Sequence, residues 1–256
     1  MEVKQLMAIA STTLFVVALI VNITFIYIVY NNGRKSIGTY KYLLASFSLC
    51  NILYSSFEYA SKPAVHIYGT SCIIYNNGLY EDSPKWGTVM LCCFYSMYGM
   101  GTALLALHFL YRYFIVCRPE RSTYFELPCI ALWIIPMLLW GLLYAFLAYY
   151  SSGPTEEIYN YAEESVRNTL HRELRKMAFF CMFTHKVEDG EVTIYWRASV
   201  GLALSTVMLI FTFGLMVICG MKIMRTLREM VMSKKAVALQ KQLLAALIVQ
   251  VLNKVY

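Results

Sequence analysis

The chain has 256 residues, of which 59% are hydrophobic and 14% are charged, and its mean hydropathy is +0.54. Soluble domains average about 45–50% apolar and about 25% charged residues, so this composition argues against a soluble fold and favours a membrane protein. The net charge of +7 does not indicate nucleic-acid binding, because the basic residues lie in short segments between long apolar runs.

Apolar runs long enough to cross a bilayer recur along the chain, since a spanning helix needs about 20 mostly apolar residues. The first run is too long for the apolar core of a signal peptide. The last run, residues 243–252, covers only about 15 Å of a roughly 30 Å hydrocarbon core. We predict an all-α transmembrane bundle with five full spans and a partial sixth, at residues 6–31, 40–61, 86–117, 127–150, 196–223 and 236–254.

The loops differ in their content of lysine and arginine. Loops after the first, third and fifth expected spans are rich in these residues, whereas the loop after the second span offsets two lysines with two acids. Cytoplasmic loops carry the excess of basic residues, so the N-terminus is expected outside. The basic residues used are Arg34, Lys35, Lys41, Arg112, Arg118, Arg121, Lys222, Arg225, Arg228, Lys234, Lys235 and Lys241.

Residues 151–195 form a long acidic segment that this orientation places outside. Apolar side chains recur in it at helical spacing from Ile158 to Met177, and Thr155 fits the N-cap position. We expect a short amphipathic helix across the outer mouth of the bundle. A mobile acidic loop is the alternative.

Two of the eight cysteines, Cys72 and Cys181, lie in polar segments expected outside. That side is oxidising, so a disulfide between them is predicted. The alternative is that the two cysteines never meet, because spacing in the sequence does not define disulfide geometry. No C-x-x-C pair occurs, and a metal site is not expected.

Residues that could carry catalysis are not grouped in this sequence. The four histidines are scattered, and neither an H-E-x-x-H pattern nor a glycine-rich phosphate loop occurs. We therefore expect neither an enzyme nor a cofactor, and we expect no nucleic-acid partner.

Arg112 follows the long uncharged stretch of the third expected span. A charge at the bilayer centre costs several kcal/mol, so such residues lie at the interface or have a function. Taken by itself, Arg112 is more simply interpreted as an interfacial arginine that reaches toward the headgroups.

The segment around Arg112, however, resembles a known pattern. Residues 106–120, Ala-Leu-His-Phe-Leu-Tyr-Arg-Tyr-Phe-Ile-Val-Cys-Arg-Pro-Glu, resemble the end of the third helix in the nematode serpentine receptors of class r (Str-type). Further segments resemble, in order, the start and end of that family's second helix, the end of its fifth and the start of its sixth: residues 37–44, 54–58 with 62–66, 218–222 and 233–250.

This resemblance implies a seven-helix chemoreceptor in the plasma membrane of sensory neurons, at the cilium. It would detect a small odorant-like ligand outside and activate a heterotrimeric G protein inside. Arg112 would then bias the balance between resting and coupled states. Tyr111 precedes it where the wider superfamily has an acid, so the partner of Arg112 stays open. The candidate coupling residues are Tyr111, Arg112, Tyr113, Arg118, Arg225 and Arg228.

Basic residues at these positions have a simpler interpretation as ordinary positive-inside charges touching lipid phosphates. Candidate ligand contacts are an acid near the outer end of the second span and aromatic residues in the outer halves of the third and fourth. The alternatives are a solvated helix end for the acid and plain packing or an interfacial belt for the aromatic residues. These candidates are Glu58, Tyr95, Tyr98, Trp140 and Tyr144.

Residues 251–256 depart from the sequence pattern of the family. A truncated isoform, a mis-spliced gene model or a pseudogene would each show such a departure. We expect that the 256-residue chain alone does not activate a G protein. A transporter or channel fragment, or a membrane protein that retains receptor helices without signalling, is the alternative to a receptor.

Overall fold

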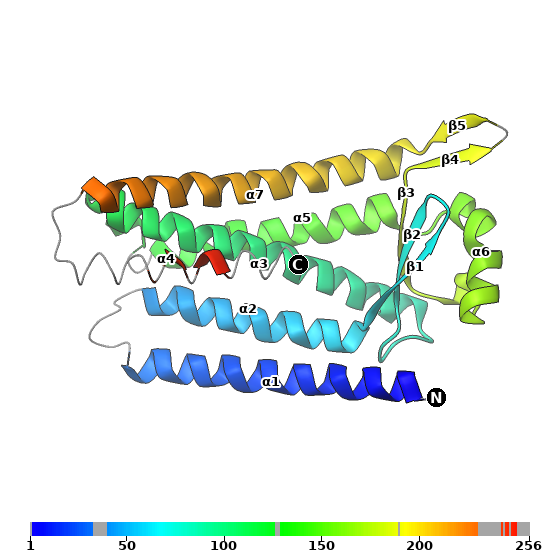
Figure 1. The fold of residues 1–256 in the computed structure, drawn as a ribbon, viewed down its shortest axis with the longest axis horizontal. Coiled ribbons are helices and arrows are strands. Elements are labelled where there is room, and N and C mark those ends of the chain that lie inside the picture. Colours follow the sequence, from blue (N-terminus) through cyan, green and yellow to red (C-terminus); the bar gives the residue numbers. More distant parts are fainter. Residues whose placement is uncertain are drawn as a thin grey trace.

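The computed structural model describes residues 2–32, 40–125, 129–188, 190–229, 242, 244–245 and 247–249. Five long helices run back and forth along one direction in this part of the chain (Figure 1). They are α1 (Glu2–Asn32), α2 (Tyr40–Ser61), α3 (Pro84–Cys117), α5 (Ile134–Ser152) and α7 (Trp196–Glu229). Helix α3 contacts α2, α5 and α7, and α1 packs against α2. Arg34, Lys35 and most of the predicted partial sixth span lie outside the described residues.

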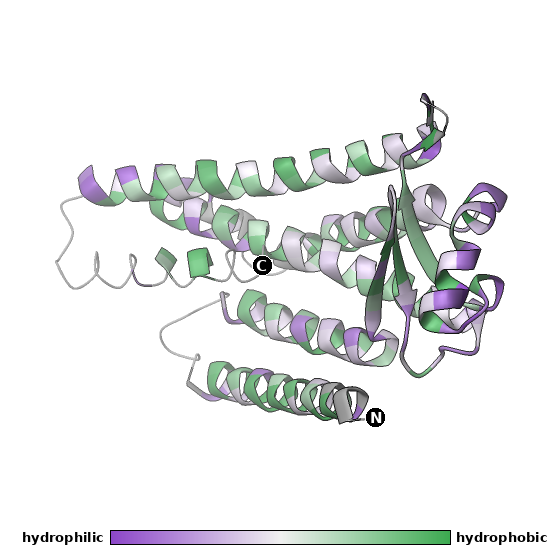
Figure 2. Cartoon of the chain, turned by 45° about the vertical axis from the view of Figure 1, so that its right-hand side comes forward, coloured by the Kyte–Doolittle hydropathy of each residue, from purple (hydrophilic) through white to green (hydrophobic). Residues whose placement is uncertain are grey.

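Four of these helices, α1, α3, α5 and α7, are long and apolar enough to cross a membrane. Helix α2 falls outside this set, because serines, tyrosines and an asparagine lower its hydropathy. In α3, half of the most apolar 18-residue stretch is buried inside the bundle. In α1, only 6% of the corresponding stretch is buried. The hydrophobic colour runs along the helices in Figure 2, as expected for surfaces that face lipid. The predicted helical bundle of the seven-helix receptor type is confirmed.

The segment expected as one span over residues 127–150 is divided in the structure. A short helix α4 (Cys129–Leu132) is followed by a turn at Trp133 and then by α5. Pro136 has no N–H to donate to the carbonyl of Leu132, four residues earlier. The proline therefore explains why the helix is interrupted at this point. A 3-10 helix, η1 (Pro119–Phe125), connects α3 to this region.

Glycines allow α3 and α5 to approach closely. A Cβ atom added to Gly99 would lie 2.6 Å from Cδ2 of Tyr144, and one added to Gly141 would lie 2.9 Å from the carbonyl oxygen of Ser96. Small residues at helix interfaces are the usual way for helices to pack tightly in lipid, where no hydrophobic effect drives them together. The α3–α5 contact therefore requires glycine at both positions.

Strands form at one end of the bundle, here called the sheet end (Figure 1). The strands β1 (Pro63–Tyr68), β2 (Ser71–Asn76) and β3 (Phe179–Phe183) make an antiparallel sheet in the order β1-β2-β3, and β4 (His185–Glu188) pairs with β5 (Glu191–Ile194). Gly69 turns the chain between β1 and β2 with a φ of +52°, which glycine adopts at little cost. The sequence analysis did not predict these strands.

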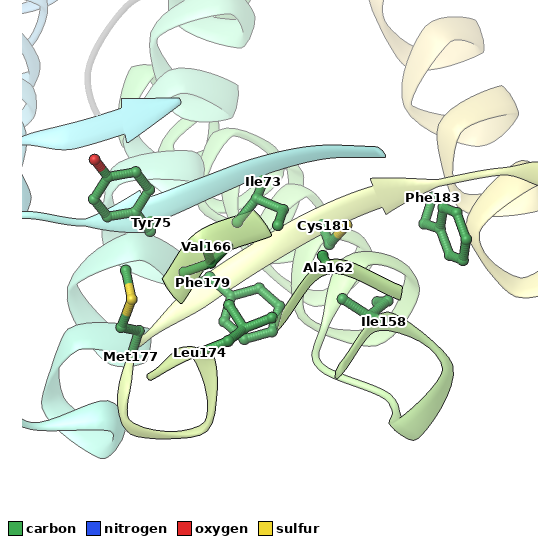
Figure 3. Close-up of a cluster of buried hydrophobic side chains, with 10 residues drawn as sticks. All are labelled: Ile73, Tyr75, Ile158, Ala162, Val166, Leu174, Met177, Phe179, Cys181 and Phe183. Atoms are coloured by element: carbon green, nitrogen blue, oxygen red, sulfur yellow. The ribbon is translucent and has the colours of Figure 1, made fainter. Parts of the chain in front are cut away.

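Helix α6 (Glu156–Leu170) covers the sheet and confirms the predicted amphipathic helix in place of a mobile loop. The Thr155 side chain caps it by accepting a hydrogen bond from the N–H of Ile158 at 3.4 Å. The helix ends at His171, which has a left-handed backbone with a φ of 55°. Leu174, in the 3-10 helix η2 (Leu174–Lys176), and Met177 reach the same hydrophobic core from outside α6. Figure 3 shows this core between α6 and the strands.

The predicted disulfide between Cys72 and Cys181 is wrong, since both thiols are free. In the β2–β3 register Cys181 lies opposite Ile73, and Cys72 lies opposite Met182. Opposite residues share a face of a sheet and consecutive residues alternate between faces. The two cysteines therefore point to opposite faces, and a one-residue shift of the register would be needed to join them.

Replacing Gly141 with alanine should destabilise the bundle, because the added methyl group meets the backbone oxygen of Ser96. Overpacking of this kind costs about 1–3 kcal/mol. Gly214→Ala is the matched control, since nothing lies within 4 Å of the added Cβ in α7. Thermal unfolding of the purified chain in detergent measures both, and equal melting temperatures for the two variants would contradict the close α3–α5 contact.

Alkylation of the native protein should find Cys72 and Cys181 as free thiols. Burial raises the pKa of both thiols, that of Cys181 to about 12, so reaction with iodoacetamide at neutral pH should be slow and should speed up as the pH rises. Cys181 is fully buried and should react only after denaturation. Peptide mass mapping without reductant provides the measurement, with C72S and C181S to assign the products. A disulfide-linked pair of peptides in fresh protein would contradict the register.

Candidate functional site

The buried guanidinium of Arg112 lies at the end of the bundle opposite the sheet, here called the arginine end, where α3 and α7 finish. Its side chain is 6% exposed, and its Cζ atom lies 5.0 Å from the centre of the Tyr40 ring, at the start of α2. The Tyr40 ring stacks on Tyr111 with 4.7 Å between centroids, and its hydroxyl lies 3.2 Å from Nδ1 of buried His108. Helix α2 thus supplies an aromatic partner for Arg112.

This arrangement has a clear physical reason. A buried charge is costly unless other groups compensate it, and an aromatic face attracts a desolvated cation by about 2 kcal/mol. The sequence analysis left the partner of Arg112 open and did not single out Tyr40. His108 and Arg112 are four residues apart on one helix and so share a face. The four-residue spacing of these two polar residues was the feature of the sequence that could have predicted a polar group of another helix packing against this face of α3.

Two of the remaining coupling candidates lie near the last turn of α3. The ammonium group of Lys222, in α7, lies 5.6 Å from the centre of the Tyr113 ring. Arg118 is the C-cap residue of α3, and its guanidinium is 3.7 Å from the carboxylate of Glu120. Both members of that ion pair are exposed, so it contributes little to stability. These side chains are accessible at the arginine end.

Arg225 and Arg228 lie on the last turns of α7 beside a cavity of about 780 Å³, which is lined mostly by α7, with one residue of α3 and with Leu244 and Ile248. Phe109 of α3 and Met216 of α7 belong to its apolar wall, and the two arginines add a basic edge. Arg225 also forms an exposed ion pair of 3.1 Å with Glu229. The cavity can accept an apolar surface that carries acidic groups at its margin.

Tyr95 lies beside the sheet, and Tyr98, Trp140 and Tyr144 lie near the middle of the bundle. Tyr98 packs edge-on against Tyr144 at 6.1 Å, joining α3 to α5, and Trp140 lies 5.8 Å from Phe211 of α7. The ring of Tyr95 packs edge-on at 5.6 Å against Phe180, which comes from β3. The structure therefore groups Tyr98, Trp140 and Tyr144 between α3, α5 and α7, and β3 contacts Tyr95.

Polar atoms in this aromatic cluster lack partners. Nε1 of Trp140 and the hydroxyl of Tyr144 are buried and have no hydrogen-bond partner in the described part of the chain. An unsatisfied buried polar group costs about 1–3 kcal/mol, and such groups call for an explanation. A bound molecule with acceptor atoms within reach of each group would satisfy them.

Glu58 lies apart from the aromatic cluster and lines a cavity between α1 and α2. The described residues contain no group of three metal-binding side chains. Phe180 and Tyr40 are the functional candidates that sequence reasoning missed, because each reaches its cluster from an element far away in the chain.

The chain resembles known proteins over nearly its whole length. The family described as "Serpentine type 7TM GPCR chemoreceptor Str" matches residues 7–254. Serpentine receptor class r-10 of Caenorhabditis elegans is 29% identical over 242 residues, which cover 91% of this chain and 69% of that protein. The class r-10 receptor of Caenorhabditis briggsae is 28% identical, with 91% and 68% covered, and the G-protein coupled receptor str-33 of Caenorhabditis elegans is 24% identical, with 93% and 70% covered. The chain therefore belongs to the Str family of serpentine, seven-transmembrane chemoreceptors of the G-protein-coupled type.

Proposed function

We propose that the chain is a chemosensory receptor that binds a small odorant-like molecule near its sheet end and couples to a heterotrimeric G protein at its arginine end. The observation that carries this proposal is the buried Arg112 beside Tyr40, since a charge placed so deep in an apolar bundle calls for a function. Family membership supports the same assignment. The family also leads us to propose the plasma membrane of a sensory neuron, at the cilium.

The ligand contacts we propose are Tyr95, Tyr98, Trp140 and Tyr144. Aromatic walls with a few polar groups are typical of small-molecule sites. The unpartnered Trp140 Nε1 and Tyr144 hydroxyl favour a small apolar molecule that carries an acceptor oxygen. We propose that β3, which supplies Phe180, covers the site.

The coupling surface we propose combines Tyr111, Arg112, Tyr113 and Arg118 with the cavity beside Arg225 and Arg228. An apolar cavity with a basic edge suits an amphipathic helix of the G protein that carries acidic residues. We propose that Tyr40 stabilises the resting position of Arg112. Release of the arginine would then accompany coupling, as a two-state change in helix packing.

The orientation we propose places the sheet end outside the cell. Acidic residues of α6 lie at the sheet end, and the last turns of α7 carry Lys222, Arg225 and Arg228 at the arginine end, as the positive-inside rule favours for a cytoplasmic face. We also propose that α2 crosses the bilayer as a fifth span between α1 and α3. A membrane protein that keeps these helices without signalling remains the competing proposal, and exchange assays separate the two.

In a version of the chain continued with further helices of a relative, replacing Tyr40 with leucine should raise basal nucleotide exchange on a co-expressed G protein, whereas the 256-residue chain alone should not activate it. Loss of an aromatic partner worth about 2 kcal/mol shifts a two-state equilibrium by roughly tenfold to thirtyfold. Arg112→Ala should abolish exchange. Both are measured in this chain and in a version continued with the remaining helices of the class r-10 relative from Caenorhabditis elegans.

Tyr40→Phe is the matched control for this experiment. It keeps the ring beside the Arg112 guanidinium and removes the hydroxyl, which contacts both His108 and Arg112. We expect basal exchange to stay below that of Tyr40→Leu, because the contact between the ring and the Arg112 guanidinium is kept. The role of Tyr40 is refuted if Tyr40→Leu does not raise exchange in the continued version while Arg112→Ala makes that version inactive.

Engineered glycosylation acceptors should report the orientation. Sites inserted near Gly153 and Gly190, at the sheet end, should be glycosylated in membrane-inserted protein, and a site near Gly33 should not be. Mobility shifts before and after deglycosylation provide the measurement. Modification near Gly33 would reverse the proposed orientation and remove the basis for G-protein coupling at the arginine end.

A further inference from the structure

The cavity between α1 and α2 lies at the sheet end and is separate from the aromatic cluster. It measures about 880 Å³ and is lined by residues of both helices, of the start of β1 and of the segment after β2. The two helices run side by side there, with β1 continuing directly from α2 (Figure 1). The volume is within the range of about 300–1,000 Å³ that small-molecule sites occupy.

Glu58 gives this cavity its charge. Throughout the described part of the chain, no side chain or backbone group forms an ion pair or hydrogen bond with its carboxylate. Two acids near this cavity are paired: Glu81 with Arg172 at 3.4 Å, and Glu156 with Arg175 at 2.6 Å. Glu58 is exposed, and among the described residues its carboxylate is left open to a ligand.

The cation that lines the same cavity does not neutralise Glu58. The ammonium group of Lys62 lies 5.0 Å from the centre of the Tyr59 ring and makes no ion pair with Glu58. Glu81, which also lines the cavity, is engaged by Arg172. Glu58 and Lys62 thus bring one charge of each sign to the cavity; the Lys62 ammonium lies over the Tyr59 ring, and the Glu58 carboxylate is the group that can accept hydrogen bonds from a cation.

Aromatic rings beside Glu58 add a second feature that suits an organic cation. Phe15 and Tyr59 stack at 4.7 Å with 10° between their planes, and both line the cavity. The Tyr59 hydroxyl lies 3.3 Å from Oγ1 of Thr12, which ties the ring to α1. The Tyr59 ring is already engaged by Phe15 and by the Lys62 ammonium, so the stacked pair serves as an apolar surface that a substituent of the ligand can contact.

We propose that the cavity between α1 and α2, with Glu58 on its wall, is a binding site for a small organic ammonium ion that carries an apolar group. The ammonium group donates hydrogen bonds to the Glu58 carboxylate, and the apolar group packs against Phe15 and Tyr59. This site goes beyond the proposed odorant site, and its occupancy does not require G-protein coupling.

Benzylamine and benzyl alcohol are matched probes, because they share a shape and only the amine is charged at neutral pH. Each is titrated against the full chain in nanodiscs of zwitterionic lipid, and binding is measured by saturation-transfer-difference NMR with empty nanodiscs subtracted. We expect the chain to bind benzylamine at least tenfold more tightly than benzyl alcohol, since charge-assisted hydrogen bonds are the stronger ones.

Glu58→Gln should remove that preference and leave binding of the alcohol within about twofold. Glu157→Gln is the control, because this acid is exposed on α6, outside the cavity, and should keep the preference intact. Ser11→Phe, which fills the cavity from α1, should weaken binding of both probes. The melting temperature of each variant reports whether it is folded.

Equal binding of amine and alcohol by the unmutated chain would overturn the proposal, whatever the variants do. So would a preference that survives Glu58→Gln, or one that Glu157→Gln removes to the same extent. If Glu58→Gln does not fold, undiminished amine binding by Ser11→Phe would also refute the site. Because no G protein is present, a failure here is distinct from a failure to signal.

Discussion

The close contact of α3 with α5 is the constraint on which the rest of the bundle depends. Gly99 and Gly141 leave no room for a Cβ atom between the two helices. In lipid, where helix surfaces gain nothing from excluding water, such contact and its dispersion energy drive association. Once α5 is fixed against α3, Tyr144 packs with Met208 of α7, so α7 is positioned by the same contact.

Helix α3 links the two candidate functional regions. It carries Tyr98 near its middle and Arg112 near the arginine end, about 21 Å apart along its axis at 1.5 Å per residue. The neighbours of α3 provide the partners at each level: Tyr144 from α5 for Tyr98, and Tyr40 from α2 for Arg112. A displacement of α3 relative to α2 or α5 would therefore change both clusters together.

The sheet end has its own hydrophobic core, which is distinct from the lipid-facing bundle. Ile158, Ala162 and Val166 of α6 pack on Ile73 and Phe179 of the strands (Figure 3). The ion pairs around α6 are exposed and contribute only about 0–1 kcal/mol each, so the apolar core and the Thr155 cap are what fix α6 on the sheet. The other face of the sheet presents Phe180 to Tyr95 of α3. The cap over the bundle is therefore a folded unit with one side for its own core and one for the helices.

The sequence by itself determined the class of the protein. Long apolar runs require helices in lipid, because helical backbones satisfy their own hydrogen bonds, and the spacing from Ile158 to Val166 together with Thr155 was sufficient to predict α6. The motif around Arg112 and its companions along the chain pointed to the family that the comparisons then showed. These signals are local, and each can be recognised within a short stretch of residues.

Only the tertiary structure decided which distant residues meet. The strand register separated Cys72 from Cys181, which the sequence had suggested as a pair, and helix packing brought Tyr40 to Arg112 and Phe180 to Tyr95. Helix packing also divided the predicted ligand contacts, since Glu58 faces α1 while the aromatic residues gather between α3, α5 and α7. The physical reason is that periodicity assigns a side chain to a face of its own helix or strand, whereas its partner depends on the register and rotation of neighbouring elements. Long-range packing sets these, and no local pattern encodes them.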